Sequence, residues 1–373
     1  TARKGRPLAE QLPLAEVVTW QEPEILYTRF ERFNAMAKPA LPIFSQQVRQ
    51  WVLQKQRKGR IFDIAHQILP QAMRHPSPLR HLGIPYVLGP LGGGLETPAG
   101  FIHEVGAGSG LARFRAFDRL RLRHDPLLRA SYSRAAMLIG VAPYVQRHLE
   151  GAGLGHLPFT PALERGHGTL PDMPQRQAEV GKLRLLHVGR VIRTKGLRDT
   201  VRAMAHLRDL PQVTLVSAGA GEDLPACRAE AAQLGLEDRI QFLEKIPRAQ
   251  VDAEYRTADV FCFPSFREPM GGVFFEAMEY GLPVIAAAYG GPDFIVDDRS
   301  GLRLPVETPN QYAGAIAAAI RTLAMDPSRR LALGQGARAR IAEIGTWQGK
   351  AQQTLALYRD ILQRQVPAGQ GVP

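Results

Sequence analysis

The second half of the chain alternates short apolar runs with amphipathic segments. Segments 196–210 and 222–235 place apolar residues at helical spacing, and Gly235 ends the second of them. The apolar runs around them are typical of buried strands: 183–189, 213–219, 239–243, 258–264 and 283–288. Strands that alternate with helices in this way predict βαβ units and a parallel sheet with both faces covered.

The first half of the chain is less regular but of the same kind. Short apolar runs indicate further parallel strands at 60–67, 84–90 and 135–143. Segment 151–182 is rich in Gly, Pro and polar residues, which is typical of a connection between domains. The expected fold class is therefore α/β, with two parallel-sheet domains.

These patterns divide the chain into four parts. We expect a first domain over 1–170, a second over 171–345, a C-terminal helix over 346–365 that packs back toward the first domain, and a flexible tail over 366–373. The length of 373 residues agrees with two domains, because single cores usually stop growing at ~250–300 residues.

The composition adds a basic charge to this picture. Lys and Arg number 47 against 35 Asp and Glu, which suits an anionic partner such as nucleic acid, a phosphorylated ligand or a membrane surface. Only eight of the 47 are Lys, so 39 are Arg. That ratio fits planar phosphate recognition, but it equally fits GC-rich bacterial coding. The charge by itself therefore decides little.

The cysteines and the hydropathy of the chain indicate its cellular setting. Cys227 and Cys262 are too far apart and too few for a zinc cluster or a disulfide framework, which favours a reduced, cytoplasmic setting. No apolar run approaches the ~20 residues that a spanning helix needs. We therefore expect any membrane contact to be peripheral.

The first stretch that carries chemistry is VGRVIRTKG, residues 188–196. Gly189 at the strand end lets a ligand approach the backbone, and the helix that follows offers free N–H groups and a positive dipole end. Arg190 and Lys195 add two cations. The combination fits a diphosphate, while the alternative is two solvated cations at a strand end.

The second stretch is PSFREPMGGVFFEAMEYG, residues 264–281. Gly271 and Gly272 stand where a helix begins, so bare N–H groups can meet another phosphate oxygen. Glu268 on the loop and Glu276 in the helix can face one crevice, and a carboxylate suits the vicinal hydroxyls of a sugar. Alternatively, Glu268 is a surface residue and Glu276 only stabilises the helix dipole.

Both stretches follow strands of one predicted sheet, at the edge where open α/β sheets bind ligands. One stretch supplies two cations and an anion-binding turn, and the other supplies two carboxylates that can hold hydroxyls. Together these groups describe a nucleoside-diphosphate sugar.

These residues resemble the retaining GT-B glycosyltransferases of family GT4. The resemblance covers about 183–364 and is carried by GRVIRTKG, LVSAGAGEDLPACRAEAAQLGLEDRIQFLEKIPRAQV, E-x7-E from Glu268 to Glu276, and GLPVIAAAYGGPDFIVDDRSGLRLP. It implies two Rossmann-like domains facing each other across a cleft. The usual Gly-Phe-Gly of the family is replaced here by Pro269, Met270 and Gly271, a change that leaves the anion-binding turn but alters the sugar pocket.

The resemblance also assigns roles to residues. It implies that Arg190 and Lys195 bind the donor diphosphate and that Glu276 binds the ribose. Glu268 and the backbone after it would hold the transferred sugar. The donor-binding set that it implies is Gly189, Met270, Gly271, Gly272, Val273 and Glu276, and the catalytic set is Arg190, Lys195, Glu268 and His66.

In the first half the resemblance covers FDIAHQ, IPYVLGPLGGG and AAMLIGVAPYVQRHL. His66 follows an aspartate by three positions at a strand end, and a buried histidine with satisfied hydrogen bonds is the alternative to a catalytic one. Gly92, Gly93 and Gly94 form either an acceptor-side loop or a flexible turn. Family members begin with a strand, a glycine-bearing loop, a long helix and a second strand. None of these is visible before residue 60, so we expect the first domain to lack this unit or to be rearranged.

Segment 109–129 is a basic amphipathic stretch. On a helix, Arg115, Arg119 and Arg123 form one stripe, and Phe114, Phe117 and Leu120 form another. Such a segment can lie on an anionic membrane surface, or it can be a charged face over a packed apolar one.

The expected function is transfer of a hexose-type sugar from a UDP-, GDP- or ADP-sugar to a glycan or lipid-linked acceptor, with retention and by front-face attack. No Asp-x-Asp pair occurs, so we expect no metal and no other cofactor. A catalytically inactive nucleotide-sugar-binding protein is the first alternative. A nucleic-acid-binding protein is the second, but scattered Arg residues without an aromatic platform argue against it.

Overall fold

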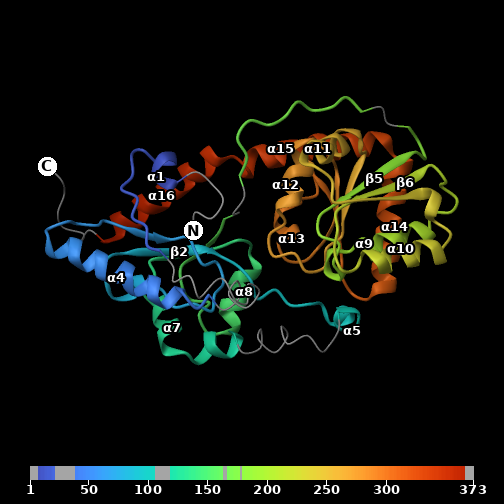
Figure 1. Ribbon diagram of the computed structural model, residues 1–373. Coiled ribbons are helices and arrows are strands. Elements are labelled where there is room, and N and C mark those ends of the chain that lie inside the picture. The colour runs from blue at the N-terminus through green and yellow to red at the C-terminus, as the bar shows by residue number, and fades with distance from the viewer. Residues whose placement is uncertain (1–6, 22–37, 106–117, 163–165, 177–178, 366–373) are drawn as a thin grey trace.

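The computed structural model of the chain describes residues 7–21, 38–105, 118–162, 166–176 and 179–365. Two sheets organise them (Figure 1): one has the strand order β1-β2-β3-β4, and the other has the order β10-β9-β8-β5-β6-β7. Every strand pair in both sheets is parallel. The prediction of two parallel-sheet α/β domains is therefore confirmed. The tail predicted over 366–373 lies outside the described residues.

The first sheet consists of β1 (Ala65–Gln67), β2 (Tyr86–Leu91), β3 (Met137–Gly140) and β4 (Phe159–Pro161). Three longer helices accompany it: α4 (Leu41–Arg57), α7 (Pro126–Ser133) and α8 (Tyr144–Gly151). The shorter elements are α1 (Leu8–Gln11), η1 (Pro78–His81), η2 (Ala99–Phe101) and α5 (Ile102–Val105).

Two of these elements differ from the sequence-based expectation. Strand β4 lies inside the predicted connection 151–182, and its three residues are too few to show a period. Helix α4, of 17 residues, precedes β1 where we saw no long helix. Its apolar side chains are interrupted by Gln and Arg, and only Val52 is buried. A stripe that is so lightly buried leaves a weak pattern.

The second sheet consists of β5 (Leu183–Val188), β6 (Val213–Ala218), β7 (Ile240–Glu244), β8 (Val260–Phe263), β9 (Val284–Ala287) and β10 (Gly301–Leu304). Its helices are η3 (Arg193–Lys195), α9 (Leu197–Ala205), α10 (Leu224–Gln233), η4 (Glu237–Arg239), α11 (Arg248–Thr257), α12 (Gly272–Glu279), α13 (Pro292–Ile295), α14 (Pro309–Met325) and α15 (Pro327–Ile344). We did not predict β10, an edge strand that is only partly buried.

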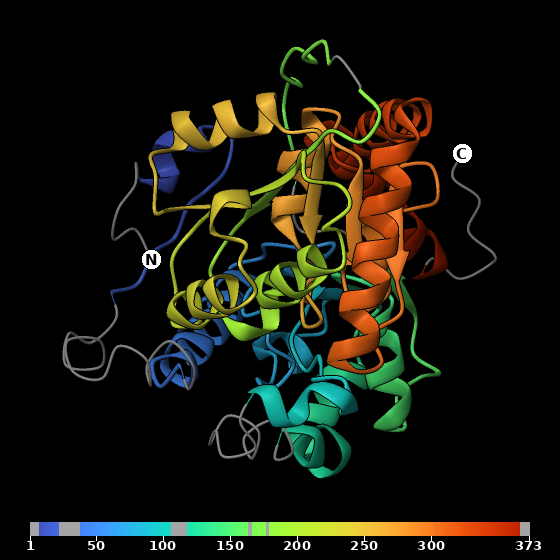
Figure 2. The same ribbon diagram turned by 90° about the vertical axis from the view of Figure 1, so that its right-hand side faces the viewer.

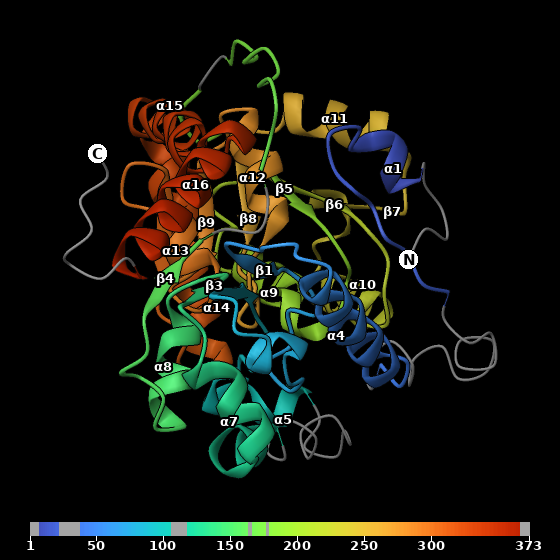
Figure 3. The same ribbon diagram turned by 90° about the vertical axis from the view of Figure 1, so that its left-hand side faces the viewer.

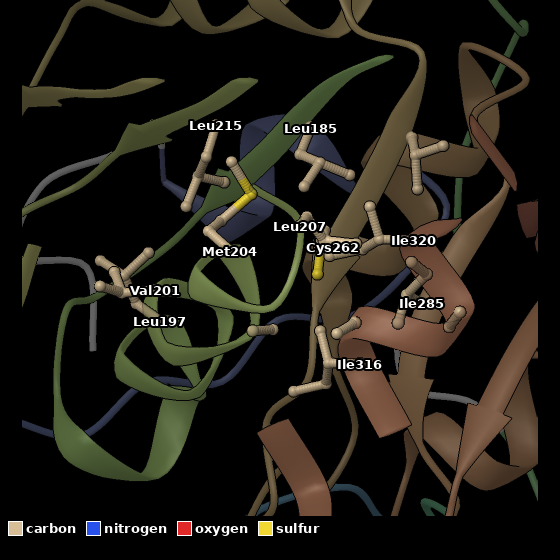
Figure 4. Close-up of a cluster of buried hydrophobic side chains, with 14 of the residues drawn as sticks. Leu185, Leu197, Val201, Met204, Leu207, Leu215, Cys262, Ile285, Ile316 and Ile320 are labelled. Carbon is tan, nitrogen blue, oxygen red and sulfur yellow. The ribbon is translucent and has the colours of Figure 1, made fainter. Parts of the chain in front are cut away.

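Apolar side chains cover both faces of the second sheet. On one face, shown in Figure 4, strand residues such as Leu185 and Ile285 meet Val201 of α9 and Ile316 of α14. Helix α14 is the long orange helix beside the sheet in Figure 2. On the other face Phe261 packs among residues of α12 and α15. Burial on both faces explains the continuous apolar strands of the sequence.

Helix α16 (Trp347–Gln365) follows α15 and returns to the first domain, as can be followed in Figure 3. Ile361 of α16 is buried in one cluster with Val87 of β2 and Ile139 of β3. The last helix of the chain thus packs on the first sheet.

Candidate functional site

The predicted phosphate-binding turn lies between β5 and α9, at the carboxyl edge of the second sheet. Gly189 ends the strand, and η3 presents Lys195 just before α9 begins. The Lys195 side chain is only 10% exposed, whereas Arg190 is exposed and forms no ion pair among the described residues. The sequence placed both cations in this turn, but the structure buries only one of them.

Lys195 forms an ion pair with Glu268, which lies on the loop after β8. The Glu268 side chain is 14% exposed. The ammonium group of Lys195 also lies 5.9 Å from the ring centre of Phe263 at the end of β8. The pair joins the two sequence stretches that we expected to share one ligand. Because little water reaches it, its charges act strongly on a bound anion.

The helix after Glu268 begins at Gly272, and no side chain caps its N-terminus. Gly271 precedes it in the left-handed region, with φ of 93°. A Cβ at this position would lie 2.5 Å from the Phe274 ring, so only glycine fits. The first N–H groups of α12, which include that of Val273, have no intrahelical partner and so can bind an anion.

The loop that carries Glu268 is held from the neighbouring strand connection. The amide of Gly291 donates a 2.9 Å hydrogen bond to the carbonyl of Glu268. Met270 of the same loop packs against the apolar cluster of the first domain. The backbone expected to contact the transferred sugar is therefore fixed between the two domains.

Glu276 already has partners in the structure. Its Oε2 atom accepts a 2.7 Å hydrogen bond from Arg248 at the start of α11, and the Tyr255 hydroxyl lies 3.5 Å away. Sequence analysis missed both residues, because nothing in the spacing of α11 shows that it faces α12. A ribose that binds Glu276 must share this carboxylate with Arg248 or displace it.

His66 lies apart from these residues, in the middle of β1. One ring nitrogen is 2.8 Å from the carbonyl of Gly89, and the other is 2.6 Å from the Tyr358 hydroxyl of α16. Burial lowers the pKa of His66, which favours the neutral imidazole. Both nitrogens are thus engaged within the first domain, and no described contact joins His66 to Lys195 or Glu268.

The glycine loop, Gly92–Gly94, follows β2. Gly94 lies against the imidazole of His148, and Gly93 is exposed. Close to this loop is Tyr144, the first residue of α8, which sequence analysis did not single out. Burial raises the pKa of Tyr144, the Gly93 backbone lowers it, and the Glu268 carboxylate raises it. Tyr144 therefore lies beside the glycine loop, within range of the Glu268 charge.

A segment of the first domain, residues 95–105, is docked onto the second; we call it the strap. Phe101 is fully buried in the core of the second domain and lies 4.2 Å from the ring of Phe266. Glu104 accepts hydrogen bonds from Arg193 at 2.5 Å and from Arg202 at 2.8 Å. Since Arg193 belongs to the same turn as Lys195, the strap is anchored at the phosphate-binding turn.

Two further predictions concern metal ions and segment 109–129. Among the residues that the structure describes, no group of three His, Cys, Asp or Glu side chains could hold a metal ion. Part of segment 109–129, including Phe114, Arg115 and Phe117, lies outside the described residues. Within 118–129 the helix is interrupted at Asp125, which caps α7, and Arg119 pairs with Glu96 at 2.5 Å.

The fold and site define a two-domain GT-B protein. Sucrose-phosphate synthase from Thermosynechococcus elongatus superposes with a TM-score of 0.61 and 22% identity, over 92% of this chain and 82% of that chain. Anabaena Alr3699/HepE in complex with UDP gives 0.59 and 18%, over 86% and 82%. At these identities the likeness establishes the fold.

Residues 171–340 match the family model described as Glycosyl transferases group 1, and the resemblance of the motifs in this part of the chain is confirmed. The D-inositol 3-phosphate glycosyltransferase of Kribbella flavida is 36% identical over 186 residues, which are 47% of this chain and 43% of the relative. The enzyme of that name in Corynebacterium jeikeium is 33% identical over 216 residues, 54% and 49% of the two chains. The chain thus spans about half the length of the curated relatives it matches.

Proposed function

We propose that this chain is a retaining glycosyltransferase that moves a hexose-type sugar from a nucleoside-diphosphate sugar to a glycan or lipid-linked acceptor. The observation that carries the proposal is the nearly buried Lys195–Glu268 pair between the Gly189 turn and the uncapped N-terminus of α12. Cation, carboxylate and free amides match the diphosphate and the sugar hydroxyls of such a donor. The named relatives and the UDP complex of the Anabaena protein support this choice.

In the proposed donor complex, the diphosphate lies between Lys195 and the first amides of α12, and exposed Arg190 can close over it. Glu268 then accepts hydrogen bonds from the sugar, and Glu276 accepts them from the ribose. Lys195 would therefore exchange part of its interaction with Glu268 for the phosphate oxygens. The exchange costs little, because the ammonium group stays paired with an anion throughout.

In the reaction, the bond between the anomeric carbon and the diphosphate oxygen breaks while the acceptor hydroxyl attacks from the same face. The acceptor proton passes to the departing phosphate oxygen, so configuration is retained without a covalent enzyme intermediate. Negative charge grows on the leaving diphosphate, where Lys195, Arg190 and the α12 dipole stabilise it. We propose that these protein groups do the work that a metal ion does elsewhere.

The acceptor is proposed to enter beside the glycine loop and Tyr144. An anionic membrane surface is the proposed location if the acceptor is lipid-linked. No helix among the described residues is long and apolar enough to cross a bilayer. Co-sedimentation with anionic and neutral vesicles tests the membrane contact. We expect the chain to bind the anionic vesicles only.

Thermal-shift screening with UDP, GDP, ADP and their sugars tests the donor assignment. A ligand that binds only the native state raises the unfolding temperature with occupancy. We expect one nucleotide to stabilise the chain and its sugar to stabilise it at least as well. No stabilisation by any of them contradicts the proposal. Stabilisation without turnover on any acceptor would instead identify a binding protein without transferase activity.

A further inference from the structure

A pocket of about 370 Å³ lies in the first domain between the start of α4 and the loop that leads into η1. The polar residues that line it are Lys38, Ser45, Arg49, His75, Arg80 and His81, together with Gln46. The loop is attached to the carboxyl end of β1, because the Ser77 hydroxyl donates a 2.7 Å hydrogen bond to Gln67. The loop beside the pocket is therefore tied to the end of a strand.

The pocket has an unbalanced positive charge. Its lining contains no Asp or Glu, and among the described residues no carboxylate pairs with Lys38, Arg49 or Arg80. Two arginines just outside the pocket do have carboxylate partners. Arg74 pairs with Asp118 at 3.0 Å, and Arg121 pairs with Asp125 at 2.7 Å. Arg80 donates a 2.7 Å hydrogen bond to the Ser77 carbonyl, and the neighbouring Arg134 contacts His81 without a carboxylate partner among the described residues, so the positive charge around the pocket is only partly neutralised.

His75 provides a second observation. Its Nε2 atom is buried and has no hydrogen-bond partner among the described residues. Burial is the main cause that lowers the pKa of His75 to about 4, and the charges of Arg74, Lys38 and Arg121 add to it. A buried polar atom without a partner destabilises the fold, so a ligand atom that satisfies it gains that energy.

Helix α4 contributes through its dipole. It is 17 residues long, and no side chain caps its N-terminus, which forms one wall of the pocket. The positive end of a helix of this length favours an anion by about 0.3–1 kcal/mol at an exposed site. The dipole, three cations and an unsatisfied imidazole thus converge on one space.

We propose that this pocket is a phosphate-binding site that takes a phosphomonoester or diphosphate group. Arg49 and Arg80 present planar groups that suit two phosphate oxygens, and Lys38 supplies a point charge. The pocket shares no residue with the Lys195–Glu268 site. The proposal therefore goes beyond glycosyl transfer and holds whether or not the donor assignment is correct. The phosphate can belong to a soluble ligand or to a lipid headgroup.

Isothermal titration calorimetry of the full chain with inorganic phosphate and pyrophosphate tests the soluble source. Arg49 is exposed, so Arg49→Gln removes the charge without disturbing the core. We expect the Kd of this variant for the probe that the wild type binds to rise about tenfold or more, because a charged hydrogen bond is lost. Arg57→Gln, exposed at the other end of α4, is the matched control and should bind like the wild type.

Flotation with phosphatidylcholine vesicles, with and without phosphatidic acid, tests the lipid source with the same variants. If the wild type binds a soluble probe and Arg49→Gln weakens that binding, a soluble ligand is supported. If the wild type binds only the vesicles that contain phosphatidic acid, and Arg49→Gln weakens that binding, a lipid headgroup is supported. Equal binding by Arg49→Gln, Arg57→Gln and the wild type, or no binding of any probe, overturns the proposal.

Discussion

At the scale of single residues, the contact between Glu276 and Arg248 bears most on the proposed ribose site. Glu276→Ala removes the proposed ribose ligand but leaves Lys195 and Glu268 in place. We expect the donor KM to rise about tenfold while kcat changes little, because the lost contact exists in both ground and transition states. Steady-state kinetics measure this, with exposed Glu237→Ala as control. A drop in kcat at constant KM would contradict the ribose role.

His187 gives a prediction on pH at the same scale. Burial lowers its pKa to about 4, and it lies 3.3 Å from the carbonyl of Lys195. Its pKa is about 6.5 in the unfolded chain, so the unfolded state takes up a proton first as pH falls. The contribution of neutral His187 to the free energy of unfolding is therefore fully present above pH ~6.5 and is lost as the pH falls toward ~4. Denaturant titrations should show that His187→Gln loses less stability across this window than the wild type does.

The residue types of the site could be predicted from sequence, but their pairing could not. Lys195 and Glu268 were recognised because each follows a strand of one parallel sheet, and such ends meet at one edge. Arg248 and Tyr255 were missed because they come from α11, whose position over α12 depends on packing. Tyr144 belongs to the other domain, so no local spacing relates it to Glu268.

At the scale of elements, the proposed anion-binding site depends on the start of α12. Gly271→Ala forces a Cβ toward Phe274 and puts a left-handed φ on an L side chain. We expect a loss of about 1–3 kcal/mol in unfolding free energy together with weaker donor binding. Gly314→Ala in α14, where no atom lies within 4 Å of the new Cβ, should instead add about 0.5–1 kcal/mol. Urea midpoints of the two variants compare them, and a neutral Gly271→Ala would contradict the geometry.

Elements with a clear apolar run were predictable, and several lightly buried ones were not. The five predicted strands of the second half all exist. Four are largely buried, as at Leu185 on one face of the sheet and Phe261 on the other, whereas β7 is only partly buried. Strands β4 and β10 were missed because each is short and only partly buried. Helix α4 was missed because its buried stripe is narrow.

At the scale of the whole molecule, the strap joins the Gly92–Gly94 loop to the turn that carries Arg193 and Lys195. Phe101→Ala removes a fully buried ring, which should cost about 3–5 kcal/mol of the stability of the second domain. Ile102→Ala is the neighbouring control, because Ile102 is 45% exposed and should change stability by less than about 1 kcal/mol. Denaturant unfolding followed by intrinsic fluorescence measures both. Equal midpoints would show that the strap does not dock in solution.

The docking of the strap was beyond sequence reasoning. Residues 95–105 carry the buried ring of Phe101 and the carboxylate of Glu104, and neither reveals that its partners lie far along the chain, as Arg193 and Arg202 do from Glu104. Gly100 also allows a close approach, since a Cβ there would lie 1.9 Å from the carbonyl oxygen of Glu307. The division into two α/β sheets follows from local periodicity, whereas contacts between the domains depend on three-dimensional packing.

The most direct test of the proposed function is the single-turnover rate of sugar transfer by Lys195→Ala with saturating donor. Loss of one preorganised charge on the leaving diphosphate should slow transfer about 10²–10³-fold. Lys182→Ala is the control, because Lys182 is exposed at the start of β5 and pairs only with Glu179 among the described residues. We predict a wild-type rate for Lys182→Ala and a strongly reduced rate for Lys195→Ala. An unchanged rate in Lys195→Ala would contradict the assignment of this turn to the donor diphosphate.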